Sequence, residues 1–321
     1  MHEEKVLLLI IAHLPEKLEA QLMEIDSVQK YLDIIEKLKH NYTYEEPACP
    51  NILFPKQVYV PKFIFRGHGD HKNYKILPGI FRTHNPSYGV VATMYSQMEY
   101  NVLHDFISEA CKYVKDVSVN DIPAWLEIAQ HFGVPTRLLD FTENPLVALY
   151  FACSDLTDKQ ASVWIINEFT YNKIFFGEAA IVSAEKSRCC ISQIITDEIV
   201  QQNYQNHDGR CYIQYPWIYK PCYREERMNL QSSVFMLWGA RRQELTSFME
   251  SKHFMSDEND IKNQECGVIC NILIPGDRKR ELLEQLNLCG INEKLIYPGL
   301  DGVGRFIKQK YSDKRFCNFR P

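Results

Sequence analysis

Residues 129–152 read AQHFGVPTRLLDFTENPLVALYFA, and this stretch constrains the fold more tightly than any other part of the chain. The apolar periodicity that leads into it predicts a helix ending at Gly133, since glycine readily adopts the backbone conformation that follows a helix end. Pro135 restricts the residue before it, so this helix cannot continue. A second helix begins around residues 142–145 and runs to about Cys153. It is apolar on all sides, which predicts that it is buried.

Polar side chains concentrate between these two helices. Arg137 and Asp140 would be costly to bury there unless they are paired or bound to a ligand. Gln130 and His131 belong to the same cluster. A single histidine in such a place is more often a hydrogen-bonded core residue than a catalyst, although it can titrate near neutral pH. Two interpretations stay open: a network that fixes the turn, or the wall of a binding site.

A second polar cluster follows a short apolar strand at residues 62–66, which Gly67 is expected to stop. The stem of Arg66 can lie against the core, while its guanidinium must find acceptors. The neighbouring glycines allow a ligand or another backbone to approach closely. Arg66 is therefore either a clamp for phosphate or carboxylate, or one half of a structural pair with Asp140. We expect both clusters to form one site.

The remaining elements mix helices and strands without regular alternation, which indicates an α+β fold. Asp26 and Gln29 fit a capping pair at the start of a first helix. The expected helices span about 26–39, 96–114, 278–286 and 303–310, the expected strands span 161–167, 233–237 and 267–274, and a proline-rich linker and a turn occupy 44–61 and 78–82. This predicts an N-terminal helical segment and linker (1–60), a main domain (61–310) and a C-terminal tail (311–321).

The composition is that of a globular protein, with 45% apolar and 24% charged residues. A net charge of −5 provides no overall basic field for holding nucleic acid or anionic lipid. The 11 cysteines are odd in number and lack paired C-x-x-C sets, so we expect reduced thiols and no metal site. The apolar stretch at 6–12 is too short to cross a bilayer. We therefore expect a cytoplasmic protein with no membrane partner.

Phe65-Arg66-Gly67 and the stretch 129–152 together resemble the FRG domain family, and the resemblance extends from about residue 60 to about 310. Phe141 stands where the family often has tryptophan, and Ser232 and Ser233 replace a common glutamine-glycine element. Further matching residues are Arg227, Gln231 and Phe235, and the run Tyr297-Pro298-Gly299-Leu300-Asp301-Gly302. This resemblance implies a bacterial or phage-related protein, often found near toxin or phage-defence genes.

The order of several elements is also similar to arginine-type ADP-ribosyltransferases. Those enzymes place an arginine on a first strand, a Ser/Thr strand before a helix, and a glutamate upstream of a strand with an inward aromatic. Arg66, the run Asp140-Phe141-Thr142 and Glu226 before Phe235 occupy these positions. The resemblance implies a central mixed or antiparallel sheet, split as in ADP-ribosyltransferases, with flanking helices, and catalytic roles for Arg66, Thr142 and Glu226.

The same resemblance implies NAD as substrate. An arginine can grip its pyrophosphate, and a carboxylate can stabilise the positive charge that develops on the ribose. Glu226 is the first candidate carboxylate, with Asp140 and Asp301 behind it. The alternative for Glu226 is a solvated position in its charged run. The expected cofactor-binding residues are Arg66, Gln130, His131, Arg137, Asp140, Phe141, Arg227, Gln231, Phe235 and Asp301. Phe141 or Phe235 would stack on the nicotinamide.

Two functional hypotheses follow. The first is an NAD-dependent ADP-ribosyltransferase or NAD glycohydrolase, which modifies a macromolecular target or depletes the cofactor in a toxin or phage-defence system. The second is a non-catalytic module that binds a nucleotide or a protein, in which Arg66, Arg137 and Asp140 only bind or brace. A nuclease is a weaker third, because the sequence has no obvious cluster of metal-binding carboxylates.

Overall fold

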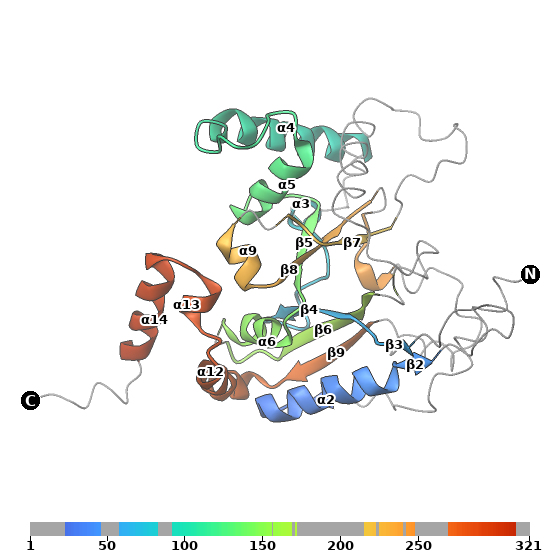
Figure 1. Cartoon of the computed structure of the whole chain (residues 1–321), viewed down its shortest axis with the longest axis vertical. Helices are drawn as coiled ribbons and strands as arrows, with labels where there is room; N and C mark the ends of the chain where they lie inside the picture. Colours follow the sequence, from blue (N-terminus) through green and yellow to red (C-terminus); the bar gives the residue numbers. More distant parts are fainter. Residues whose placement is uncertain are drawn as a thin grey trace, which may run out of the picture.

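The computed structural model describes residues 23–45, 58–82, 92–155, 157–168, 171, 215–222, 225–239, 242–247 and 269–312. The apolar stretch at 6–12 and most of the expected C-terminal tail lie outside these residues. No helix within the described ranges is long and apolar enough to cross a membrane. The described part is a mixed α+β structure built on one large sheet, as the sequence predicts (Figure 1).

The large sheet has seven strands in the order β1-β9-β6-β4-β5-β8-β7. All neighbouring strands are antiparallel except β1 and β9, which are parallel. The strands are β1 (Met23–Glu24), β4 (Phe63–His68), β5 (Leu138–Thr142), β6 (Ala161–Asn167), β7 (Trp217–Tyr219), β8 (Ser233–Leu237) and β9 (Ile269–Ile274). A separate pair, β2 (Tyr44–Glu45) and β3 (Val58–Tyr59), is also antiparallel.

The large sheet divides in its middle, between β4 and β5. β4 is paired with β6 along its whole length, from Phe63 to His68. It is paired with β5 only where Phe65 faces Thr142. β5 is then paired with β8 along its own whole length. The sheet therefore consists of two halves, β1-β9-β6-β4 and β5-β8-β7, joined at one residue pair.

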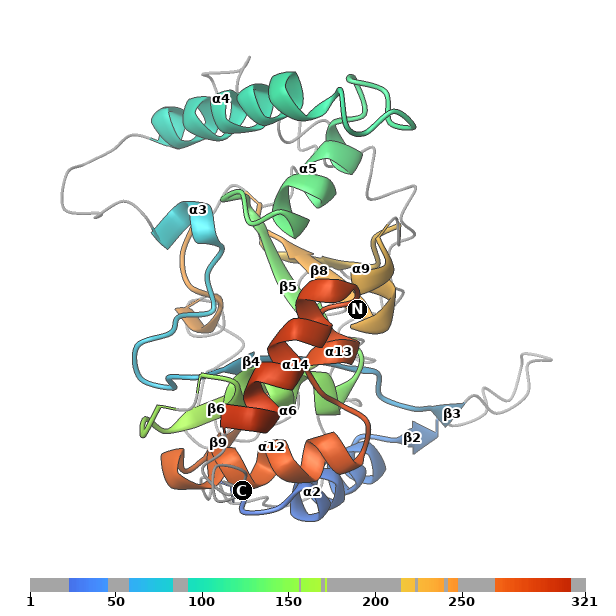
Figure 2. The ribbon, with the colours of Figure 1, turned by 90° about the vertical axis from the view of Figure 1, so that its left-hand side faces the viewer.

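A buried helix, α6 (Pro145–Cys153), covers one face of β4 and β6. Asn144 caps it by accepting hydrogen bonds from the backbone amides of Leu146 (2.9 Å) and Val147 (3.4 Å). The helix is buried as the sequence predicts. It packs in turn against α12 (Lys279–Leu288), beside which lies α2 (Val28–Asn41). Figure 2 shows α2 and α12 at one end of the molecule and α4 and α5 at the other.

The other half of the sheet is covered by α5 (Ile122–His131), which packs against α4 (Ala92–Ala110) and β5. Asp121 caps α5 by accepting a hydrogen bond from the amide of Ala124. After the helix, Gly133 has a positive φ of 78°, which confirms the expected role of this glycine. The remaining helices are α3 (Gly79–Arg82), α9 (Glu226–Leu230), α13 (Glu293–Ile296) and α14 (Leu300–Ser312).

Some local predictions need correction. Gly67 does not stop β4, which continues to His68. It is required because α6 crosses here: a Cβ on Gly67 would lie 2.0 Å from the carbonyl oxygen of Ala148. Residues 78–82 form the short helix α3 rather than a turn, and the expected linker contributes β2 and β3 at its ends. The cap of α2 is Ser27 rather than Asp26, because the Ser27 hydroxyl accepts the Lys30 amide.

Candidate functional site

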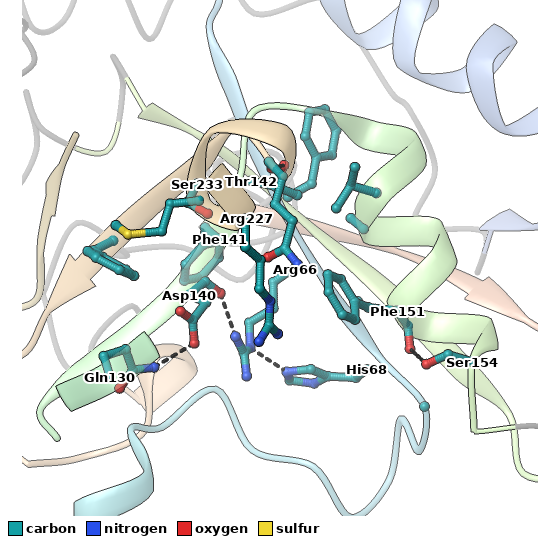
Figure 3. Close-up of a pocket in the computed structure, with 18 of the residues that line it drawn as sticks. Arg66, His68, Gln130, Asp140, Phe141, Thr142, Phe151, Ser154, Arg227 and Ser233 are labelled. Atoms are coloured by element: carbon teal, nitrogen blue, oxygen red, sulfur yellow. Dashed lines mark hydrogen bonds between the residues drawn. The ribbon is translucent and has the colours of Figure 1, made fainter. Parts of the chain in front are cut away.

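A cavity of about 420 Å³ opens where β4 and β5 separate (Figure 3). Strands β4, β5 and β8 line it, together with α3, α6, α9 and the end of α5. Its lining includes Arg66, His68, Tyr74, Arg82, Gln130, His131, Asp140, Phe141, Thr142, Phe151, Asp155, Arg227, Gln231, Ser233 and Phe235. The two polar clusters of the sequence therefore meet in one place, as expected.

Arg66 lies at the centre of this cavity. Its Nε donates a hydrogen bond to Nε2 of His68 (3.0 Å), and its Nη1 donates to the backbone carbonyl of Asp140. The second bond crosses the division of the sheet from β4 to β5. Burial, together with the charge of Arg82, lowers the pKa of Arg66 to about 10, and Asp140 opposes this shift. The guanidinium therefore stays cationic at neutral pH.

His68 supports Arg66 from the same strand. Residues two apart on a strand point to the same face, so Arg66 and His68 lie side by side. The imidazole is buried, and burial with the repulsion of Arg66 lowers its pKa to about 3. His68 is therefore neutral at physiological pH, and its Nε2 accepts a hydrogen bond from Arg66 without adding charge.

Asp140 is held by a short polar chain from the end of α5. Its Oδ2 accepts a hydrogen bond from Nε2 of Gln130 (2.6 Å). Oε1 of Gln130 in turn accepts the hydroxyl of Thr136 (2.5 Å). His131, which follows Gln130 in the chain, also lines the cavity. Burial lowers the pKa of this histidine, and the positive charge of Arg227 lowers it further. The network therefore both fixes the turn and forms the wall of the cavity.

Thr142 joins β5 to α9. Its hydroxyl donates to the backbone carbonyl of Gln231 (2.6 Å) and accepts the amide of Asn144 (2.9 Å). The side chain of Gln231 then donates to the carbonyl of Ile296 on α13 (2.8 Å). The Thr142 hydroxyl therefore already makes two hydrogen bonds, which hold the segment after α9 against the end of β5.

Arg227 enters the cavity from α9, and in Figure 3 its side chain points to the same part of the cavity as that of Arg66. Its guanidinium lies over the ring of Tyr297, 4.9 Å from the centroid. Arg305 of α14 lies over the same ring at 4.6 Å. Such contacts hold a guanidinium without neutralising its charge.

The family model for the FRG domain matches residues 61–161. This chain contains an FRG domain. The matched segment runs from the start of β4 to the start of β6 and includes Arg66, Gln130, Asp140 and Thr142. No curated protein and no solved structure is similar enough to this chain to be matched to it.

Part of the cavity lies outside the matched FRG segment. Arg227, Gln231 and Phe235 line it from α9 and β8. The FRG domain match ends before these elements, so the proposed extent of 61–310 stays a prediction. The cavity nevertheless includes residues from both sides of that boundary.

Three expected site residues lie outside the cavity lining. Arg137 is buried beneath the cavity wall, where Glu99 of α4 binds its Nε at 2.8 and 2.9 Å. Glu226 is exposed at the start of α9, although the next residue lines the cavity. Asp301 is exposed in the first turn of α14. Glu226 therefore lies in the solvated position that was its alternative, and Arg137 is paired with Glu99 outside the cavity lining.

Other lining residues were not expected from the sequence. Arg82 ends α3, a segment that the sequence analysis assigned to a turn without a role. Tyr74 and Phe151 also line the cavity, and no local pattern distinguishes them. His68 could have been predicted as a site residue, because it lies two residues after Arg66 on the same strand and therefore faces the same side.

Asp155 completes the wall next to the glycines of the FRG motif. Its Oδ1 accepts a hydrogen bond from Nζ of Lys279 (2.6 Å), which also donates to the carbonyl of Gly69 (2.8 Å). Lys279 is fully buried, so this pair ties α12 to the loop after β4. Among the described residues, no group of histidine, cysteine and acidic side chains could hold a metal ion.

Proposed function

We propose that the cavity binds NAD or a related nucleotide through Arg66. The observation that supports this is the position of the guanidinium. It lies inside the cavity and is held by an imidazole and a backbone carbonyl, with no carboxylate paired to it among the described side chains. A cation held by neutral groups keeps its charge available for a phosphate.

The size and lining of the cavity suit a nucleotide. Its volume of about 420 Å³ falls within the range usual for small-molecule sites. Phe151 is partly exposed and provides aromatic surface for stacking on a base or on nicotinamide, whereas Phe141 and Phe235 line the cavity but are almost fully buried. The division between β4 and β5 is consistent with the split sheet that the resemblance to ADP-ribosyltransferases implies.

The proposed reaction breaks the bond between nicotinamide and ribose. Nicotinamide leaves with the bonding electrons, and an acceptor nucleophile forms the new bond to the ribose and loses a proton. If water is the acceptor, the product is ADP-ribose. Asp140 takes the role first considered for Glu226, because its carboxylate lines the cavity and would stabilise the developing positive charge.

Such an activity would act in the cytoplasm, where NAD is available. It would modify a macromolecule or deplete the cofactor within a bacterial toxin or phage-defence system. The genes beside the coding sequence, and toxicity on expression in bacteria, would bear on this role.

A non-catalytic nucleotide-binding module is the second candidate. Two observations favour it: Glu226 is exposed and does not line the cavity, and the hydroxyl of Thr142 is already engaged in two hydrogen bonds. In this case Arg66 and Asp140 would bind the nucleotide without breaking it.

Isothermal titration calorimetry with NAD, combined with chromatography of released nicotinamide, separates these possibilities. The wild type would be compared with Arg66→Ala, Asp140→Asn and Glu226→Gln, with Arg280→Ala on the exposed surface of α12 as control. Turnover that is lost in Asp140→Asn and retained in Glu226→Gln supports the enzyme. Binding without turnover supports the module. A wild type that does not bind NAD overturns the proposal.

A further inference from the structure

Three arginines line the cavity, and each comes from a different element. Arg66 lies on β4, Arg82 ends α3, and Arg227 lies on α9. Arg66 and Arg82 are close enough for the charge of one to lower the pKa of the other. Like charges repel, so such a group needs either local acids or an anionic ligand to balance it.

Local acids do not hold these arginines. Nε of Arg82 donates to the carbonyl of Leu77 (2.7 Å), and its Nη2 donates to the carbonyl of Lys75 (3.4 Å). Arg227 is held by the ring of Tyr297. Within the described ranges, none of the three has a carboxylate within ion-pair distance.

Arg137 shows how this protein neutralises an arginine that has only a structural role. Its guanidinium is buried and paired with both carboxylate oxygens of Glu99. The three cavity arginines instead contact neutral groups, namely an imidazole, backbone carbonyls and an aromatic ring. These contacts fix the position of each guanidinium and leave its positive charge unneutralised. This is the arrangement expected where the counter-charge arrives with a ligand.

The acidic groups of the cavity do not cancel this charge. Two aspartates line it, and Lys279 already pairs with Asp155 at 2.6 Å. The charge of Asp140 acts to raise the pKa of both Arg66 and Arg82, but it is one negative charge beside three arginines. His68 adds no charge but also provides no counter-charge, since it is neutral. The cavity therefore has an excess of positive charge near its centre.

We propose that the cavity selects a ligand with two linked phosphates, and that Arg82 is the residue that distinguishes it from a ligand with one. This inference rests on the proposed nucleotide site. Arg66 would contact both phosphates, and Arg82 and Arg227 would each contact one of them. A monophosphate would leave Arg82 without a partner, whereas a nucleoside diphosphate or dinucleotide would engage all three arginines.

Calorimetric titration of the full chain with ADP, AMP and inorganic pyrophosphate tests this selection. The wild type is expected to bind ADP at least about 10-fold more tightly than AMP, since one additional charge-assisted hydrogen bond is worth that much. Arg82→Ala should weaken ADP and pyrophosphate by about 10-fold or more while changing AMP by less than about 3-fold. Arg280→Ala serves as the control, and melting temperatures confirm that each variant is folded.

The outcomes are separable from those of the proposed function. If the wild type binds NAD but binds AMP as tightly as ADP, the selection for two phosphates is wrong and the nucleotide site stands. If Arg82→Ala weakens AMP and ADP equally, Arg82 is not the distinguishing residue. If neither NAD nor ADP nor pyrophosphate binds, both proposals fail.

Discussion

Nη1 of Arg66 donates a hydrogen bond to the backbone carbonyl of Asp140, across the gap that separates two halves of one sheet. The strands on either side are paired at only one position, Phe65 with Thr142. Arg66 therefore has two roles: its hydrogen bond joins β4 to β5, and its guanidinium places a positive charge in the cavity.

Arg66→Lys should lose nucleotide binding almost as completely as Arg66→Ala. A lysine keeps the charge but cannot donate to His68 and to the Asp140 carbonyl in the fixed directions of a guanidinium. Each variant should also lower the free energy of unfolding by about 1–3 kcal/mol. Calorimetry with NAD and urea denaturation measure the two effects, and full binding by Arg66→Lys would show that charge alone is sufficient.

Gly67→Ala should lower the free energy of unfolding by about 3 kcal/mol or prevent folding, because the added methyl group has no room. Its Cβ would lie 2.0 Å from the carbonyl oxygen of Ala148 and 2.6 Å from the amide nitrogen of Ala152. Gly304 of α14 is the matched control, since a Cβ there meets nothing within 4 Å. Gly304→Ala should be neutral or stabilise by about 0.5–1 kcal/mol. Equal melting temperatures for the two variants would contradict this prediction.

Glu99→Gln should destabilise the protein by about 3–5 kcal/mol, because it leaves Arg137 buried without its counter-charge. Replacing both residues with leucine should be less harmful than this single change. Chemical denaturation of Glu99→Leu, Arg137→Leu and the double leucine variant forms a thermodynamic cycle, and Glu99→Gln is measured beside them. The fraction that stays folded should bind NAD as the wild type does, since Arg137 lies outside the cavity. Weaker binding by fully folded protein would assign Arg137 a role in the site.

The free energy of unfolding should fall as the pH rises from about 5 to about 7, because of the buried carboxyl of Glu168. Burial raises the pKa of this carboxyl from its ordinary 4.5 to about 7, with Lys62 opposing the shift and Glu143 adding to it. Below pH 4.5 it is protonated in both the folded and unfolded states, so it has no effect there. Above that pH the unfolded chain ionises first, which favours unfolding by up to about 3 kcal/mol near pH 7.

Glu168→Gln removes this titration and should flatten the dependence of the unfolding free energy on pH relative to the wild type. Lys62, which lies 3.7 Å from Glu168, and Lys220, which pairs with Glu143 at 3.0 Å, remain in place as the nearby charges. Urea denaturation at several pH values measures the difference between the two proteins. A constant difference from pH 5 to pH 8 would mean that Glu168 titrates normally.

Tyr297→Ala should weaken NAD binding by about 2- to 5-fold through loss of the ring that orients Arg227. Tyr297→Phe keeps the ring and should bind as the wild type does. Calorimetry on both variants makes the comparison, with melting temperatures as the check on folding. Equal loss in the two variants would assign the effect to the hydroxyl group instead of the ring.

Much of the fold could be predicted because its signals are local. The strand at Ala161–Asn167 and the strand at Ser233–Leu237 have the bounds that the apolar pattern indicates. Residues 217–219 and 293–296 are too short to carry such a pattern, and they were missed. Residues 78–82 were assigned to a turn, since a helix of one turn depends on its packing more than on its own sequence.

The sequence by itself determined the FRG motif and the buried helix at Pro145–Cys153, because apolar pattern and chain breaks are properties of neighbouring residues. Only the tertiary structure decided which charged groups are available to a ligand. Arg137 is neutralised by Glu99, 38 positions away on helix α4, while Arg82 is placed in the cavity by a segment with no distinctive pattern. Charge at a site depends on partners that folding brings together, and those partners are distant along the chain.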